Sequence, residues 1–147
     1  MSLHGHYDPQ NIFALIIRGD APCYKIYEDA DVLAFLDLFP QSRGHVLVIP
    51  KASQARNILE VEPVVLGAMM SAVQRLTRII VDELQPDGVQ VAQFNGTVAG
   101  QTVYHIHMHI IPRWDGEAPG IHGRGKADPQ ELEALQARLV ERIRSEA

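Results

Sequence analysis

Three histidines alternate with apolar residues in the second half of the chain. His105, His107 and His109 are separated by Ile106 and Met108. Side chains along a strand point alternately to opposite faces, so the run predicts three imidazoles on one face and apolar residues on the other. Imidazole can serve as an acid, a base, a nucleophile or a metal ligand near neutral pH. The run is the first place to look for chemistry.

The run allows three interpretations. Three histidines on one face fit a purely structural role poorly. A metal site is the second interpretation, since His is a frequent ligand of zinc, iron, copper and nickel. Asp37 and His45 could complete such a site, although no Asp or Glu stands at a recognisable ligand spacing near the run. Nucleophilic or acid–base catalysis on an anion is the third.

The loop that precedes the run favours the third interpretation. Gly100 permits a backbone geometry in which consecutive N–H groups can point at one oxyanion. Asn95, Gln101 and Thr102 add neutral donors. On its own the loop reads as a simple turn between strands. Beside the histidines, it predicts a site for a phosphate ester rather than a metal.

Composition narrows the class of protein. The chain has 147 residues, 46% hydrophobic and 21% charged, which suits one soluble globular domain over residues 1–147. A net charge of −5 argues against a partner that is a nucleic-acid duplex. No apolar run approaches membrane-spanning length and the N-terminus lacks a signal-peptide pattern, so no membrane is expected. The single cysteine, Cys23, cannot form an internal disulfide and fits a reducing, cytoplasmic location.

The hydrophobic pattern predicts an α+β fold, with a mostly antiparallel five-stranded sheet and helices packed on it. A first helix is expected to follow Asp8 as N-cap and Pro9 as its first residue. A Gly-rich mobile loop is expected over 115–126. The other expected elements are strands at 24–28, 32–37, 45–50, 89–94 and 105–111, and helices at 63–84 and 128–145.

The segment from Gly100 to Pro112 resembles the signature of the histidine triad (HIT) superfamily, His-φ-His-φ-His-φ-φ with φ apolar. The segments 32–37, 40–41 and 44–51 resemble the nucleotide-binding half of that family. The likeness runs from about Asn11 to Arg113, so the 115–126 loop and the last helix lie beyond it. It implies a HIT-like fold, and residues 111–113 resemble bacterial and polyphosphate-cleaving members.

The resemblance implies a role for each matching residue. His107 matches the nucleophile that attacks the α-phosphorus, and His109 matches a contact to the phosphate or leaving group. His105 matches a residue that orients its neighbour, and His45 a further phosphate-side histidine. Asp37 matches the carboxylate that accepts hydrogen bonds from the ribose hydroxyls. The remaining nucleotide-binding positions are Asn95, Gln101 and Thr102 near the phosphate, with Gly100 in the same loop, and Phe13, Leu36 and Leu38 around the base.

The implied function is a hydrolase or transferase that cleaves at the α-phosphate of a purine nucleotide conjugate through a nucleotidyl-histidine intermediate. The conjugate is a dinucleoside polyphosphate or a nucleoside phosphoramidate, and no cofactor is needed. The alternatives are a non-catalytic nucleotide-binding protein and a His-rich metalloenzyme. A nucleophilic imidazole must be neutral, so activity is expected to fall below about pH 6.

Two further expectations come from the family. Many bacterial members hold a structural zinc with a Cys-x-x-Cys pair, a later histidine and the first triad histidine. Asn11, Ala14 and Ser53 stand at the other three positions here, so we expect no zinc. A homodimer is also implied, and Met69 and Met70 in the long helix offer apolar surface for it.

Overall fold

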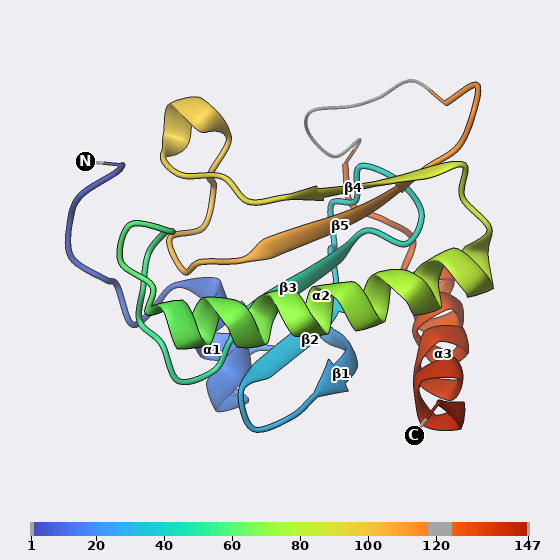
Figure 1. Ribbon diagram of the computed structural model, residues 1–147, viewed down its shortest axis with the longest axis horizontal. Coiled ribbons are helices and arrows are strands. Elements are labelled where there is room, and N and C mark those ends of the chain that lie inside the picture. The colour runs from blue at the N-terminus through green and yellow to red at the C-terminus, as the bar shows by residue number, and fades with distance from the viewer. Residues whose placement is uncertain (1, 118–124, 147) are drawn as a thin grey trace.

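The computed structural model describes residues 2–117 and 125–146, and its fold is α+β as predicted (Figure 1). Five strands form one antiparallel sheet in the order β1-β2-β3-β5-β4. The strands are β1 (Tyr24–Glu28), β2 (Val32–Leu36), β3 (Val46–Pro50), β4 (Gly88–Ala92) and β5 (Met108–Arg113). The helices are α1 (Ile12–Arg18), α2 (Pro63–Leu84) and α3 (Pro129–Ser145), with a 3-10 turn η1 (Thr97–Ala99).

The sheet has two differently covered faces because side chains alternate along its strands. One face packs against α2 and α3 in the larger core, which includes Ala34, Val48 and Ile110. The other face carries a smaller cluster in which Phe13 of α1 meets Phe35 and Leu47. This α1 side of the sheet holds the candidate site.

The long helix α2 has the predicted bounds, and one side of it is buried on the sheet. Met69, Leu76 and Ile80 are among its core residues. The helix has 22 residues and a mean hydropathy of 1.5 in its most apolar window, so by length and composition alone it could cross a membrane. The expectation that no apolar run approaches that length is therefore wrong for α2. Of that window, 28% is buried inside the protein.

The first helix starts later than predicted. Asn11, not Asp8, is the N-cap, and its side chain accepts a hydrogen bond from the Ala14 N–H. Asp8 and Pro9 belong to a preceding turn, in which the Asp8 carboxylate accepts from the Gln10 N–H at 2.8 Å. Both are good helix-start residues, but Asn11 lies directly before the segment whose Phe13 is buried on the sheet. Tertiary packing therefore decides which cap is used.

The histidine run is only partly a strand. β5 begins at Met108, and the N–H of Ile106 donates to the Ala55 carbonyl instead of to a neighbouring strand. The predicted alternation still holds on the apolar side, since Ile106, Met108 and Ile110 all join the larger core. His109 lies opposite Leu47 of β3 and Ala92 of β4.

The C-terminal helix α3 forms as predicted, with Asp128 as its N-cap and Pro129 in its first turn. Its buried side contributes Leu132, Leu135 and Leu139 to the larger core. Most of the predicted 115–126 loop, residues 118–124, lies outside the described residues.

A glycine directly before His45 offers a test of this packing. Gly44 has φ +91°, and a Cβ there would lie 2.5 Å from Leu84 Cδ1 and 3.3 Å from Pro112 Cγ. We expect Gly44→Ala to lower the free energy of unfolding by about 2–3 kcal/mol, through overpacking and the unfavourable φ. Urea denaturation measures the loss.

Gly67 is the matched control, because a Cβ there meets no atom within 4 Å and the residue lies inside α2. We expect Gly67→Ala to raise the free energy of unfolding by about 0.5–1 kcal/mol. Equal effects of the two substitutions would contradict this account of the loop before β3.

Candidate active site

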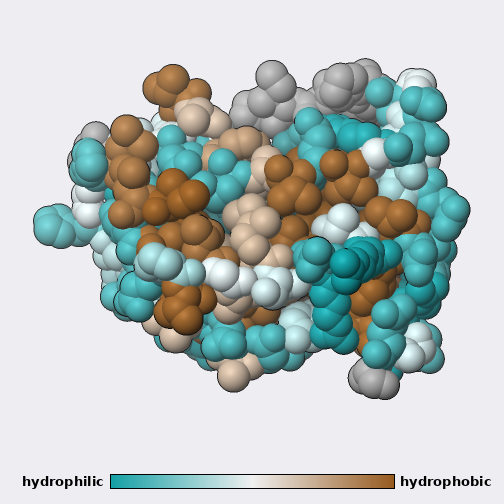
Figure 2. Space-filling model, viewed as in Figure 1, coloured by the Kyte–Doolittle hydropathy of each residue, from teal (hydrophilic) through white to brown (hydrophobic). Residues whose placement is uncertain are grey.

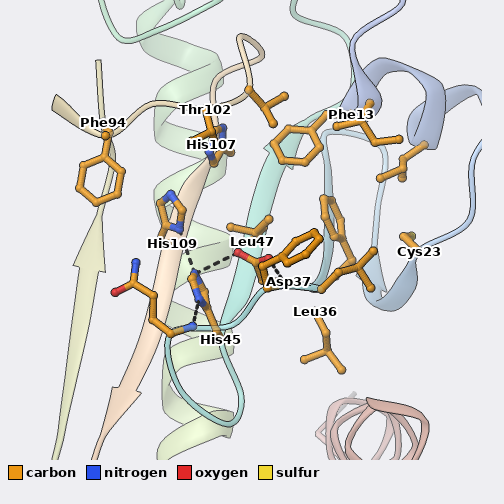
Figure 3. Close-up of a pocket in the computed structure, with 18 of the residues that line it drawn as sticks. Phe13, Cys23, Leu36, Asp37, His45, Leu47, Phe94, Thr102, His107 and His109 are labelled. Atoms are coloured by element: carbon orange, nitrogen blue, oxygen red, sulfur yellow. Dashed lines mark hydrogen bonds and ion pairs between the residues drawn. The ribbon is translucent and has the colours of Figure 1, made fainter. Parts of the chain in front are cut away.

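A cavity of about 490 Å³ opens on the α1 side of the sheet (Figure 3). Its lining combines apolar side chains, which include Phe13, Phe35 and Leu47, with three histidines. In Figure 3 the imidazoles lie between Phe94 on one side and Phe13 on the other. The predicted site residues that line the cavity are Phe13, Leu36, Asp37, Leu38, His45, Gly100, Thr102, His107 and His109.

His107 is held in one tautomer. Its Nδ1 lies 2.7 Å from the carbonyl oxygen of His105, and a carbonyl can only accept, so Nδ1 carries the hydrogen. The Nε2 of the neutral ring therefore keeps its lone pair. Burial lowers the pKa of His107 to about 4, which leaves the ring neutral at pH 7. Phe13 packs edge-on against this ring, with centroids 4.9 Å apart. The result is an oriented nucleophile or base.

A hydrogen bond with His45 holds His109 in the other neutral tautomer, with its hydrogen on Nε2. The backbone N–H of Gln41 donates to His45 Nδ1, so the hydrogen of neutral His45 is on Nε2. That Nε2 lies 2.9 Å from His109 Nδ1, which must accept, and the hydrogen of His109 is therefore on its own Nε2. His109 Nε2 is buried and has no hydrogen-bond partner among the described residues. It is a donor available to a ligand.

The same two rings are neutral for the same physical reason as His107. Burial is the main cause that lowers the pKa of His45 to about 4 and that of His109 to about 3. Asp37 opposes this at His45, because its carboxylate lies 3.6 Å from His45 Nε2. The other carboxylate oxygen of Asp37 accepts from the Phe39 N–H at 2.8 Å. Asp37 thus presents a fixed acceptor directly after β2.

His105 lies behind the cavity rather than in its lining. Its Nε2 is 3.0 Å from the Pro50 carbonyl, its Nδ1 is 2.7 Å from the Tyr7 hydroxyl, and the side chain is almost fully buried. His105 is connected to the site through its backbone carbonyl, which accepts the Nδ1–H of His107.

Asn95 and Gln101 do not line the cavity either. The Gln101 amide donates to the carbonyls of Arg56 and Val103 and accepts from the Gly96 N–H. The Asn95 amide accepts from the Ile58 N–H and is also bonded to Gln93. Both side chains fix the shape of the loop, so their expected direct contact with phosphate is not what this geometry provides.

The expected convergence of backbone N–H groups at Gly100 is also wrong. The N–H of Gly100 donates to the Thr97 carbonyl, and those of Ala99 and Gln101 donate to the Gly96 carbonyl. These bonds close the η1 turn and use the amides that an oxyanion would need. Gly100, with φ +105°, ends the turn and lets the chain enter the cavity wall.

Sequence reasoning missed three contributors. Phe94 packs against His109 with ring centroids 5.0 Å apart, Gln41 sets the tautomer of His45, and Tyr7 reaches His105. Gln41 lies in a segment that shows the family resemblance, so a role there could have been proposed. Phe94 and Tyr7 stand in no pattern that marks a site.

The residues at the family's zinc positions do not fit a zinc site. Asn11 caps α1, the Ser53 hydroxyl accepts from the Ala55 N–H, and Ala14 offers no ligand atom. Both ring nitrogens of His105 are engaged in hydrogen bonds. Within residues 2–117 and 125–146, a tetrahedral set of Cys or His ligands is therefore not available around His105.

A different group could approach a metal ion within the cavity. One ligand atom each from Asp37, His45 and His109 lie within 4.8 Å of one another. His45 and His109 are, however, hydrogen-bonded to each other, and ligation through those two nitrogens would break that bond.

The HIT domain profile matches residues 18–116 of this chain. The protein belongs to the HIT family. It is 41% identical over 138 residues to the protein named Hit from Bacillus subtilis, covering 91% of this chain and 94% of that one. It is 37% identical to the adenosine 5'-monophosphoramidase hnt1 of Schizosaccharomyces pombe, covering 90% and 98% of the two chains.

The fold of this HIT protein also matches solved structures. A Hit-like protein from Bartonella henselae, solved with an unknown ligand, superposes with a TM-score of 0.85 at 39% identity, covering 93% of this chain and 99% of that one. The described α+β architecture is thus that of the HIT fold.

Proposed function

We propose that this HIT protein is a hydrolase or transferase that acts at the α-phosphorus of a purine nucleotide conjugate. The observation that carries the proposal is the tautomer of His107, whose Nε2 lone pair faces a cavity that also contains the His109 Nε2–H donor. The adenosine 5'-monophosphoramidase among the relatives supports a phosphoramidate as the substrate class. A dinucleoside polyphosphate offers the same α-phosphorus and is the other candidate.

The proposed reaction has two steps. His107 Nε2 attacks phosphorus, a P–N bond forms to the ring, and the bond from phosphorus to the leaving nitrogen or oxygen breaks. The leaving group departs with a proton taken from solvent water, and the water that attacks in the second step returns a proton to solvent. Water then cleaves the nucleotidyl–His107 bond, releases the nucleoside monophosphate and restores the ring. The Nε2–H of His109 stabilises charge on the phosphoryl oxygens.

The shape of the cavity supports this orientation of a nucleotide. Its apolar lining residues, which include Phe13 and Leu38, suit a planar base, and the Asp37 carboxylate lies beside His45. A carboxylate there can accept from two ribose hydroxyls. The phosphate would then lie at His107 and His109.

Replacing the nucleophile tests the proposal. We expect His107→Asn to lower kcat on adenosine 5'-phosphoramidate on the order of 10³-fold or more, because no group replaces the lone pair of Nε2. Intact-mass measurement after a denaturing quench should show one nucleoside monophosphoryl group on the wild-type chain and none on the variant. A panel with a dinucleoside polyphosphate and a nucleotide sugar identifies the leaving group.

The exposed His6 supplies the control for this experiment. His6→Asn should retain wild-type turnover and the adduct. Turnover that survives His107→Asn would contradict the proposed chemistry.

The pH dependence follows from burial of His107. Protonation removes the nucleophilic lone pair, and a pKa lowered to about 4 keeps the ring neutral down to that pH. The acid limb of kcat/KM is therefore expected near pH 4, below the value of about 6 expected from the sequence alone. An acid limb at pH 6 or above in folded protein would contradict this assignment.

Folding must be followed in the same pH series. The buried histidines have pKa values below those of the unfolded chain, which binds protons first as the pH falls below about 6.5. The free energy of unfolding therefore falls as the pH drops below about 6.5. Far-UV circular dichroism at each pH separates this loss from protonation of His107.

Two other functions can be distinguished by simple measurements. A binding protein without catalysis would bind nucleotide and show neither turnover nor adduct. The cluster of Asp37, His45 and His109 favours a metalloenzyme as the second candidate. Loss of turnover after chelation and its return with added metal would support that candidate instead.

We further propose a cytoplasmic homodimer formed through α2 and β4. The reducing compartment is supported by Cys23, which has no second cysteine to pair with. For the dimer, Val64, Met70 and Val81 are exposed on α2, and hydrophobic side chains gather along that side of the molecule (Figure 2). Of the two methionines expected at this surface, Met69 lies in the core instead.

An edge-strand substitution tests the dimer. β4 is an edge strand with Val91 exposed, so Val91→Glu should convert a dimer into a monomer in sedimentation velocity. Lys25→Glu on β1, at the opposite edge of the sheet, should leave the mass unchanged. A wild-type monomer would contradict the proposal.

A further inference from the structure

Tyr7 contacts a triad histidine from outside the segment that the HIT domain profile matches. It precedes α1 and lies before residue 18, where the family match begins. Its hydroxyl is 2.7 Å from Nδ1 of His105, which is 98 positions away in sequence. The two rings are in contact, with centroids 5.7 Å apart.

The direction of this hydrogen bond is fixed by the other side of the ring. The Pro50 carbonyl accepts from His105 Nε2–H, so Nδ1 of the neutral ring is an acceptor. His105 is only 1% exposed, which keeps bulk water from serving as the donor. The Tyr7 hydroxyl is therefore the donor, and without it a buried acceptor would be left unsatisfied.

The backbone of His105 connects its fixed ring to His107, the proposed nucleophile. Its carbonyl oxygen accepts the Nδ1–H of His107 at 2.7 Å. A ring pinned between Tyr7 and Pro50 fixes the position of that carbonyl, and the carbonyl fixes both the tautomer and the direction of the His107 ring. Tyr7 and His107 are thus connected by two hydrogen bonds, both of them to His105.

The segment that carries Tyr7 is attached to the body of the protein. The buried Asn57 side chain donates to the Leu3 carbonyl at 2.9 Å. Gly5 lies against the guanidinium of Arg56, where an added Cβ would be 3.2 Å from Cζ. In Figure 1 this segment runs as the dark blue trace that leads to α1. These contacts hold the N-terminal segment, and with it Tyr7, against the body of the protein.

We propose that Tyr7 is a positioning residue for His107 and acts through the ring and carbonyl of His105. The inference rests on the proposed function of His107 as nucleophile. Tyr7 is not among the residues that line the cavity, so it should affect the chemical step rather than nucleotide binding.

The test removes only the hydroxyl. Tyr7→Phe should lower kcat roughly tenfold and leave KM within about twofold, since a displaced nucleophile slows attack while the base and ribose contacts remain. Tyr24→Phe is the matched control, because Tyr24 is also half-buried and lies in β1. It should leave both constants unchanged.

Histidine ¹⁵N spectra give a readout that needs no substrate. The wild-type chain should show His105 as the Nε2–H tautomer and His107 as the Nδ1–H tautomer. Tyr7→Phe should shift His105 Nδ1 and change the tautomer ratio or linewidth of His107, and Tyr24→Phe should do neither. An inactive wild type would overturn the proposed function, while these spectra would still decide the role of Tyr7.

A double-mutant cycle with His105→Asn completes the experiment. If Tyr7 acts through His105, Tyr7→Phe should cost less than about twofold in kcat in the His105→Asn background. Folded Tyr7→Phe protein with wild-type kcat and unchanged His107 signals would overturn the inference. So would an equal loss of kcat in both backgrounds.

Discussion

A neutral imidazole has one donor and one acceptor, and the surrounding chain decides which nitrogen is which. In this HIT protein backbone groups fix the tautomers of three histidines. The His105 carbonyl fixes that of His107, the Pro50 carbonyl that of His105, and the Gln41 N–H that of His45. The first leaves a lone pair at His107 Nε2. The last, relayed through His45, leaves a hydrogen at His109 Nε2. A ring lone pair and a ring N–H donor thus share one cavity because the main chain around them is fixed.

Burial is what keeps these assignments valid. Protonated His109 would donate from both nitrogens, and its Nδ1–H would face the Nε2–H of His45. The apolar walls that disfavour the charged rings come from the same alternation that builds the sheet, with Leu47 and His109 opposite each other on one face. The larger core on the other face holds the strands in register. Stability of the fold and reactivity of the site therefore rest on the same packing.

Local sequence was sufficient for much of this arrangement. The apolar period predicted α2, and the spacing in the histidine run placed Ile106, Met108 and Ile110 in the core. Both predictions depend on a regular period. The family resemblance, rather than a local period, grouped Asp37 and His45 with His107 and His109, and all four line one cavity.

The failures depend on contacts that no local pattern records. Asn95 and Gln101 have side chains suited to phosphate, but Asn95 is hydrogen-bonded to the backbone N–H of Ile58 and Gln101 to the backbone carbonyl of Arg56. The amides around Gly100 close their own turn. The position of the first helix is decided by where Phe13 packs, and the partner of His105 comes from the opposite end of the chain.

The attached N-terminal arm places part of the surroundings of the triad outside the segment that the domain profile matches. That segment, residues 18–116, begins at the last residue of α1 and contains all three triad histidines. It excludes Phe13 and Tyr7, which contact those histidines from upstream. Substitutions in this upstream stretch can therefore change the surroundings of the triad histidines while the signature itself stays intact. A comparison limited to the signature would count such variants as equivalent.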